Sequence, residues 1–359
     1  MNFLTLAVLI LVTYLIQKFV LMHALDGLTY DMRSERRAVE PDEPFHLVTT
    51  IENNKRLPVF FLHLNETVPA GIQLGEHEKG IDFRVMKAYG TEPLASMQQV
   101  LYLMPRQRAV RTTEVSISKR GRYILRGATL TAGDLLGLES RSCQHPLARE
   151  IVVYPRKTDI SHVKQAYGGY LGDISVRRFI MPDPIDTIGF REYTGTEPQR
   201  DISWRETLRR GRLMVKQYDY TAEMRAALIM DISGATKEEA EKIFSVTRSI
   251  ADTLEEKHIM FSFVTNAWIL SSSSVFGYVP DGTGPVHLNA VLECLGRASC
   301  DISQDTGKML RDTLKGRNDG RSYIYISADS SKHRDILNYY ETEAGQKLFR
   351  VDCAKEAVL

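Results

Sequence analysis

Oxygen-bearing side chains follow two apolar runs of the sequence, at points where buried strands would end. Asp231 and Ser233 come directly after the run AALIM, and Asp329 follows the run SYIYIS. Ligands of doubly wound sheets bind beyond the carboxyl ends of the strands, and carboxylate and hydroxyl oxygens suit a hard cation such as Mg²⁺ or Ca²⁺. The pattern therefore indicates a metal site. The alternative is that Asp231 and Ser233 cap the helix that follows, since both can accept hydrogen bonds from its free backbone amides.

A second feature with chemical content is an arm, residues 186–218, in which arginines alternate with aromatic residues. Such a mixture can stack on bases and bind phosphates. However, Glu192, Asp201 and Glu206 lie among the arginines, which favours pairing of arginine with carboxylate inside the protein. The whole chain is also balanced, with 46 Lys plus Arg against 45 Asp plus Glu. We therefore expect no nucleic acid as a partner, and we favour a protein partner because arginine and tryptophan are common interface anchors.

The order of residues in the arm resembles the DUF58 family, bacterial membrane proteins that join such an Arg/Trp motif to a von Willebrand A-like (vWA) domain. One departure is Thr196, which stands where the family has glycine, with Gly195 one residue early. The positions that match the motif are Phe190, Arg191, Tyr193, Glu197, Arg200, Ile202, Trp204, Arg209, Leu213 and Val215. Those that we expect to bind a partner are Arg191, Tyr193, Arg200, Trp204 and Arg209.

The residues after the two apolar runs resemble the metal-ion-dependent adhesion site (MIDAS) of vWA domains. In that site a D-x-S-x-S loop, a threonine on a second loop and an aspartate on a third hold one divalent cation. Here the first loop reads DISGA, so Ala235 replaces the second serine. The resemblance implies a degenerate site for Mg²⁺ or Ca²⁺ formed by Asp231, Ser233, Asp329 and Thr283, the last from the segment PDGTG. Water can fill a lost position, so a missing ligand lowers the affinity without forbidding binding.

The elements that position these residues are an α/β domain and an all-β domain. From residue 224 to 359, the runs AALIM, HIMFSFV, SYIYIS and QKLFRV suit strands covered on both faces. Helical apolar stripes lie between them, which predicts a doubly wound sheet. Residues 31–155 show alternating strand-length segments separated by turn signals, which predicts an antiparallel β-sandwich. Residues 156–223 form the connector that carries the arm.

The amino-terminal segment predicts a membrane anchor. From Phe3 to Leu25 the chain is almost entirely apolar, long enough for a helix across a hydrocarbon core of about 30 Å. Three arginines follow closely, at positions 33, 36 and 37, which by the positive-inside rule places the body of the protein in the cytoplasm. We therefore expect a single-pass protein of the bacterial inner membrane with its anchor at residues 1–25. The expected fold class is multi-domain α+β: an N-terminal transmembrane helix, an antiparallel β-sandwich and an α/β doubly wound vWA-like domain.

No catalytic constellation emerges from the sequence. The four cysteines, at positions 143, 294, 300 and 353, form no CxxC pair, and the Gly-rich segment GGYLGD lacks the pattern of a phosphate-binding loop. Because DUF58 proteins are associated with MoxR-type AAA+ ATPases, the resemblance implies a non-enzymatic adaptor. Such an adaptor would serve assembly, maturation or envelope stress and would bind this ATPase together with other membrane or envelope proteins. The alternatives are a Mg²⁺- or Ca²⁺-dependent adhesion module and a metal-dependent hydrolase centred on Asp231.

Overall fold

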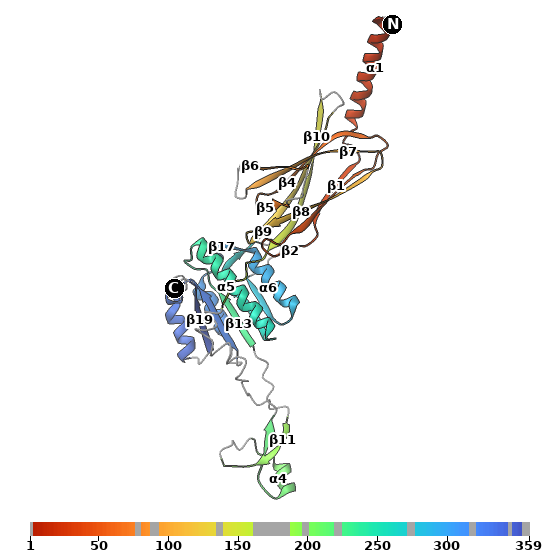
Figure 1. The fold of residues 1–359 in the computed structure, drawn as a ribbon. Coiled ribbons are helices and arrows are strands. Elements are labelled where there is room, and N and C mark those ends of the chain that lie inside the picture. Colours follow the sequence, from red (N-terminus) through yellow and green to blue (C-terminus); the bar gives the residue numbers. More distant parts are fainter. Residues whose placement is uncertain are drawn as a thin grey trace. The chain divides into compact units, whose positions relative to one another are not determined.

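A computed structural model of the protein (Figure 1) describes residues 3–75, 80–86, 93–133, 139–160, 187–195, 201–218, 225–270, 277–315, 321–343 and 347–353. The chain divides into two compact units. The first comprises Met1–Arg156 with Leu292–Ala298, and the second comprises Lys157–Val291 with Ser299–Leu359.

The first unit contains a β-sandwich. One sheet has the order β1 (Leu28–Ser34), β3 (Phe45–Asn53), β8 (Arg108–Ile117), β5 (Ile72–Leu74). The other has the order β2 (Ala38–Val39), β10 (Ser140–Val153), β9 (Gly121–Gly133), β4 (Val59–Pro69), β7 (Leu94–Leu103), β6 (Asp82–Met86). Side chains alternate between solvent and core along β3, as its sequence FHLVTTIEN predicts. Phe45 and Leu47 of one sheet pack with Met97 and Ile151 of the other, so the core lies between the two layers.

A carboxyl group is buried within this sandwich. The Oε1 atom of Glu66 on β4 accepts hydrogen bonds from Thr49 Oγ1 at 2.6 Å and from Tyr30 Oη at 3.0 Å. Burial raises the pKa of Glu66, and the two hydroxyl donors and the charge of Arg111 oppose this rise. The folded protein therefore holds a proton on Glu66 at pH values where the unfolded chain has released it.

We expect this proton to make stability depend on pH. Because the folded-state pKa of Glu66 lies above its ordinary value of 4.5, the contribution of Glu66 is fully present below that value. It is lost as the pH rises through the folded-state pKa. The substitution Glu66→Gln keeps an oxygen acceptor for Thr49 and Tyr30 and removes the buried charge. It should raise the free energy of unfolding at pH 8 by about 1 kcal/mol and flatten its dependence on pH in chemical denaturation.

The matched control for this prediction is Glu52→Gln, on neighbouring β3, whose carboxylate lies at the surface beside Arg108. Its pH profile should match that of the wild type. An equal flattening in both variants would show that Glu66 is not the titrating group.

The second unit is built on a five-stranded sheet. Its order is β16 (Tyr278–Gly282), β14 (Met260–Thr265), β13 (Arg225–Met230), β18 (Ser322–Ser327), β19 (Lys347–Asp352), and all neighbours are parallel except β16 and β14. The four runs predicted as strands are β13, β14, β18 and β19, which is confirmed. Parallel strands need crossover connections, and here helices supply them.

Helices cover both faces of this sheet (Figure 1). On one face, Ala227 and Tyr325 pack with Leu310 of α7 (Thr306–Leu314) and Leu337 of α8 (Arg334–Asn338). On the other face lies α5 (Lys237–Glu256), whose apolar stripe is buried as its periodicity predicts. The remaining described elements after β14 are the short strands β15 (Ala267–Ile269) and β17 (Ala298–Ile302), the 3-10 helix η2 (Ser330–His333), the π-helix η3 (Tyr339–Glu343) and helix α6 (Pro285–Arg297). The second half of α6 belongs to the first unit.

The arm folds as a small module of its own. Strands β11 (Thr187–Glu192) and β12 (Met214–Tyr218) pair antiparallel, and helix α4 (Trp204–Arg210) lies between them in the sequence. The helix ends at Gly211, whose φ of 68° is a left-handed conformation that glycine adopts without strain. Thr207 then accepts a hydrogen bond from the backbone N–H of Met214 at 3.0 Å, which fixes the helix against β12.

The expected transmembrane anchor is corrected by the structure. The amino-terminal residues form helix α1 (Phe3–Met22), but no helix in the described part of the chain is long and apolar enough to span a membrane. Helix α1 carries the polar residues Gln17 and Lys18, which interrupt the about 20 consecutive apolar residues that a span requires. The predictions of an N-terminal transmembrane helix and of a single-pass location in the inner membrane are therefore wrong.

Candidate functional site

The carboxylate of Asp231 is the centre of the candidate site. Asp231 follows β13 directly, and β13 is flanked by β14 and β18, so the side chain lies at the carboxyl edge in the middle of the sheet. It is buried, and its backbone N–H donates to the carbonyl of Ile326 on β18 at 2.9 Å. A buried carboxylate is stable only where donors replace the water it has lost.

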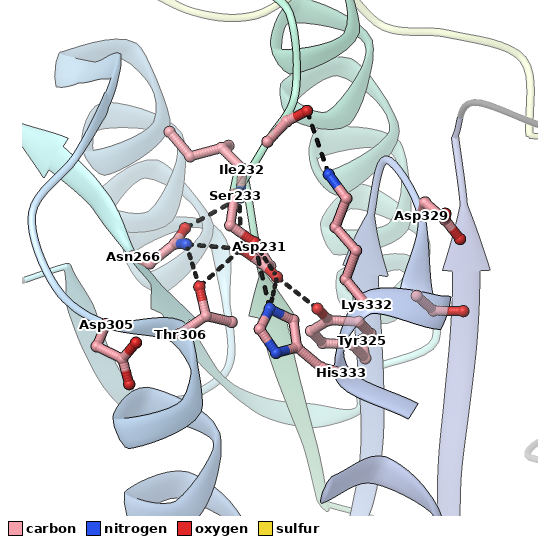
Figure 2. Close-up of polar contacts among 12 residues, drawn as sticks. Asp231, Ile232, Ser233, Asn266, Asp305, Thr306, Tyr325, Asp329, Lys332 and His333 are labelled. Carbon is pink, nitrogen blue, oxygen red and sulfur yellow. Dashed lines mark hydrogen bonds and ion pairs between the residues drawn. The ribbon is translucent and has the colours of Figure 1, made fainter. Parts of the chain in front are cut away.

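Three donors meet the Oδ1 atom of Asp231. The backbone N–H of Ser233 donates at 2.8 Å, the Asn266 side-chain amide at 2.6 Å and the Thr306 hydroxyl at 3.2 Å. They come from the loop after β13, the end of β14 and the first residue of α7. Figure 2 shows these side chains converging on the carboxylate.

The Oδ2 atom is also surrounded by donors. It accepts from the hydroxyl of Ser233 at 2.9 Å and from the hydroxyl of Tyr325 at 2.5 Å, and His333 Nε2 lies 3.7 Å away (Figure 2). Burial, followed by the charge and the hydrogen bond of Asp231, raises the pKa of Tyr325 far above its ordinary value. Tyr325 therefore keeps its proton and remains a donor at neutral pH.

Asn266 extends the network from the carboxylate to the surrounding backbone. Its Oδ1 atom accepts from the N–H of Ile232 at 3.0 Å, and its amide nitrogen lies 2.9 Å from the Thr306 oxygen. One amide thus ties together the loop after β13, the end of β14 and the start of α7. Such fully satisfied polar networks rigidify the region that contains them.

Of the residues expected in the metal site, the structure brings only Asp231 and Ser233 together. The carboxylate of Asp329 accepts from the N–H of Ser331 at 3.0 Å and from its hydroxyl at 2.7 Å, and so caps η2. Figure 2 shows Asp329 away from the Asp231 cluster. Its expected ligand role is therefore not supported.

Thr283 lies at the opposite edge of the sheet. Strand β16 runs antiparallel to β14, with Gly282 opposite Phe261 near the start of β14. Thr283 follows Gly282 at the amino edge of the parallel strands, whereas Asp231 lies at their carboxyl edge. The candidate ligand Thr283 therefore lies away from Asp231, and the threonine that reaches the carboxylate is Thr306.

Both carboxylate oxygens of Asp231 already accept hydrogen bonds from the surrounding fold. These bonds come from Ser233, Asn266, Thr306 and Tyr325, and the hydroxyl oxygens of Ser233 and Thr306 are also of the kind that a hard cation binds. In the described ranges, no three His, Cys, Asp or Glu side chains gather into a group that could hold a metal ion. Ala235 also stands where the MIDAS loop has its second serine, so one hydroxyl ligand is absent. A cation would therefore have to displace hydrogen bonds that the fold itself supplies.

The helix-cap alternative for Asp231 and Ser233 is also not realised at α5. The cap is Thr236, whose Oγ1 accepts from the N–H of Glu239 at 3.3 Å while the Glu239 carboxylate accepts from the N–H of Thr236 at 2.8 Å. This reciprocal pair satisfies the amides that Asp231 would otherwise have capped. Asp231 instead holds its own loop and the neighbouring elements.

The Ser233, His333 and Asp231 side chains do not form a nucleophilic triad. Ser233 Oγ lies 3.4 Å from His333 Nε2, and the same nitrogen is the one nearest to Asp231. In a working triad the two ring nitrogens face different partners, so that one orients the ring while the other takes the serine proton. Here the Ser233 hydroxyl donates its hydrogen bond to Asp231 itself and not to the imidazole.

Four residues of this network were not predicted from the sequence: Asn266, Thr306, Tyr325 and His333. Asn266 follows β14 at the same edge at which Asp231 follows β13, and this shared position was the available signal. Thr306 follows Asp305, which caps α7 by accepting from the Lys308 N–H at 2.8 Å. Tyr325 lies within an apolar run and carries no such signal.

The arm module supplies a second candidate site, which is a surface. Trp204 and Leu208 lie one turn apart on α4 and are 64% and 84% exposed. Arg191 and Arg209 are also at the surface, Tyr193 is half-buried, and Arg200 lies outside the described residues. The prediction that arginines pair internally is confirmed at three positions. Arg209 and Arg210 pair with Glu206, and Arg212 pairs with Glu192.

Comparisons with known proteins add little. No family model matches the sequence. The uncharacterized protein YeaD of Bacillus subtilis (strain 168) is 19% identical over 316 residues, which cover 87% of this chain and 73% of YeaD.

Solved structures resemble only part of the chain. A cohesin module from Clostridium perfringens covers 35% of this chain and 96% of its own, with a TM-score of 0.26 and 11% identity. The match to the CARDB domain of a Pyrococcus furiosus protein covers 35% of this chain and 91% of that domain's chain, with a TM-score of 0.22 and 12% identity. Likeness at this level carries no inference about function.

We expect Asp231 to be a structural anchor. The substitution Asp231→Ala leaves several buried donors without an acceptor, each at a cost of about 1–3 kcal/mol. It should lower the free energy of unfolding by at least about 3 kcal/mol in urea denaturation. Asp329→Ala removes the cap of a short 3-10 helix and should cost about 1 kcal/mol or less. Equal losses in the two variants would contradict the anchoring role.

Divalent cations should not stabilise the protein through this site. A cation present at about 100 times its Kd stabilises a folded protein by about 2.7 kcal/mol. Because donors already fill the surroundings of Asp231, we expect the same Tm in Mg²⁺, in Ca²⁺ and in EDTA by differential scanning calorimetry. A cation-dependent rise in Tm that Ser233→Ala abolishes would restore the metal site.

Proposed function

We propose that this protein is a non-enzymatic adaptor of the DUF58 type that binds a partner protein through the exposed face of α4. The partner that we propose is a MoxR-type AAA+ ATPase, as the resemblance of the arm implies. The observation that carries the proposal is the exposure of Trp204 and Leu208 side by side. Exposing two large apolar side chains one turn apart is unfavourable in water, and a partner that covers them would relieve this.

The surroundings of the two side chains support a binding role. Arg209 and Arg210 follow Leu208, so cations border the apolar pair, and tryptophan with arginine is the combination most often found at interface hot spots. Glu206, on the buried side of α4, pairs with both arginines and holds them near the helix. The cap at Gly211 and the bond between Thr207 and Met214 fix the helix before binding, which reduces the entropy lost on association.

The other two functions depend on chemistry that the Asp231 site does not favour. An adhesion module and a metal-dependent hydrolase would both need a cation with open coordination positions. The carboxylate of Asp231 is surrounded by donors from its own fold, which favours a structural use. These functions are therefore less supported than binding through α4.

The test compares the two tryptophans of the chain. Full-length protein carrying Trp204→Ala, or Leu208→Ser, should bind the purified MoxR-type ATPase of the same host at least tenfold more weakly than wild type, by biolayer interferometry. Trp268→Ala is the matched control, because Trp268 is 54% exposed on β15, outside the arm. It should change the affinity less than twofold, and EDTA should have no effect.

Two results would sink the adaptor proposal. One is the absence of binding by the wild-type protein to the ATPase. The other is an equal loss of affinity with Trp204→Ala and with Trp268→Ala, which would place the contact elsewhere.

A further inference from the structure

A polar hollow lies on the outward face of the six-stranded sheet of the sandwich, far in sequence from the arm. It has a volume of about 830 Å³ and is lined by residues of β4, β7 and β9 and by the segment that leads into β6. The side chains that matter for recognition are His63, Asn65, Gln98, Thr129 and Thr131. Most are uncharged amides and hydroxyls that can both donate and accept hydrogen bonds.

The strand register arranges these side chains in two rows. Asn65 on β4 lies opposite Gln98 on β7 and opposite Thr129 on β9. His63, two residues earlier on the same face, lies opposite Val100 and Thr131. Directly opposed residues have Cβ atoms about 5 Å apart, so each row presents neighbouring polar groups at a regular spacing.

A buried hydroxyl holds the central pair in place. Ser96 Oγ donates to Asn65 Oδ1 at 2.5 Å, and Gln98 Nε2 donates to Ser96 Oγ at 3.2 Å. These bonds use the oxygen of one amide and the nitrogen of the other. They leave the Asn65 NH₂ group as a donor beside the Gln98 carbonyl as an acceptor. Amides on a solvated surface do not need to be held in fixed positions. In a binding site, fixed amides increase the affinity, because they lose less conformational entropy when a ligand binds.

The charge of the hollow is low and its border is apolar. Neither lysine nor arginine is among the described residues that line it, and Asp82 is paired with Arg84 at 2.5 Å. Beyond Gln98 on the same face of β7, Val100 and Tyr102 are 56% and 51% exposed. An exposed aromatic ring thus follows Gln98 along the strand. The ring packs against Phe60 and its hydroxyl donates to Met104 Sδ at 2.9 Å, so the exposed part of the ring is an apolar surface.

We propose that this face binds a neutral oligosaccharide. Each sugar hydroxyl donates and accepts, so a vicinal pair of hydroxyls matches the donor of Asn65 beside the acceptor of Gln98. The C–H face of a neighbouring ring would lie on Tyr102. An extended peptide fits less well, because peptides add to the edges of sheets, whereas β4 is an interior strand between β7 and β9. This inference is independent of the adaptor role of the arm.

The test titrates the full-length protein with maltohexaose, cellohexaose and chitohexaose by isothermal titration calorimetry, with saturation-transfer NMR to detect weak binding. We expect at least one of the three to bind. Asn65→Ala and Gln98→Ala should each weaken binding at least tenfold. Tyr102→Ala should also weaken binding, because the second sugar ring loses the aromatic surface on which it lies. The matched control is Gln73→Ala, an exposed glutamine on β5 of the other sheet, which should leave the affinity unchanged.

Three outcomes would overturn the proposal. They are no binding of any of the three oligosaccharides, binding that Asn65→Ala and Gln98→Ala leave intact, and tighter binding of an anionic heparin hexasaccharide or of an extended peptide. Circular dichroism and the urea midpoint of each variant, compared with those of Gln73→Ala, separate loss of a contact from loss of the fold.

Discussion

The second unit depends on the need to surround one buried carboxylate with donors. Asp231 lies out of water at the carboxyl edge of a largely parallel sheet, where an uncompensated charge would cost several kcal/mol. The groups that compensate it come from the loop after β13, the end of β14, the start of α7 and the interior of β18. None of these elements can shift without removing a donor. The carboxyl edge of the sheet is therefore fixed by a single side chain.

This constraint bears on function as well as on stability. The carboxyl edge is where open α/β sheets bind ligands, and a vWA-like sheet would use it for a cation. Here hydroxyl, amide and backbone groups of the fold already donate hydrogen bonds to Asp231, Asp329 caps η2, and Thr283 follows a strand end at the opposite edge. We therefore look for recognition at exposed side chains. This is why the two binding proposals rest on the arm and on the sheet of the sandwich.

The sequence predicted those parts of the structure that depend on local pattern. Apolar runs identified β13, β14, β18 and β19, and the acidic residues of the arm predicted that its arginines would pair internally. The sequence could not predict which residues meet at Asp231, because Thr306 and Tyr325 reach it only through the strand order and the start of α7. Thr283 was expected near Asp231 for the same reason. The residue types of β16 do not reveal that this strand runs antiparallel to β14, which puts Thr283 at the opposite edge of the sheet. The apolar amino terminus gave a prediction of membrane insertion that the structure overturned.

The two buried carboxylates show why the number of donors, rather than burial alone, decides what such a group does. Glu66 accepts hydrogen bonds from two hydroxyl groups on one oxygen, and burial outweighs them, so the pKa of Glu66 is raised. Asp231 has donors at both oxygens, including a backbone N–H that cannot turn away. A group of the first kind tunes stability with pH, while a group of the second kind fixes geometry. The same reasoning applies to Asn65 and Gln98, whose bonds to Ser96 fix two amides at the surface, where a ligand can use the groups that remain.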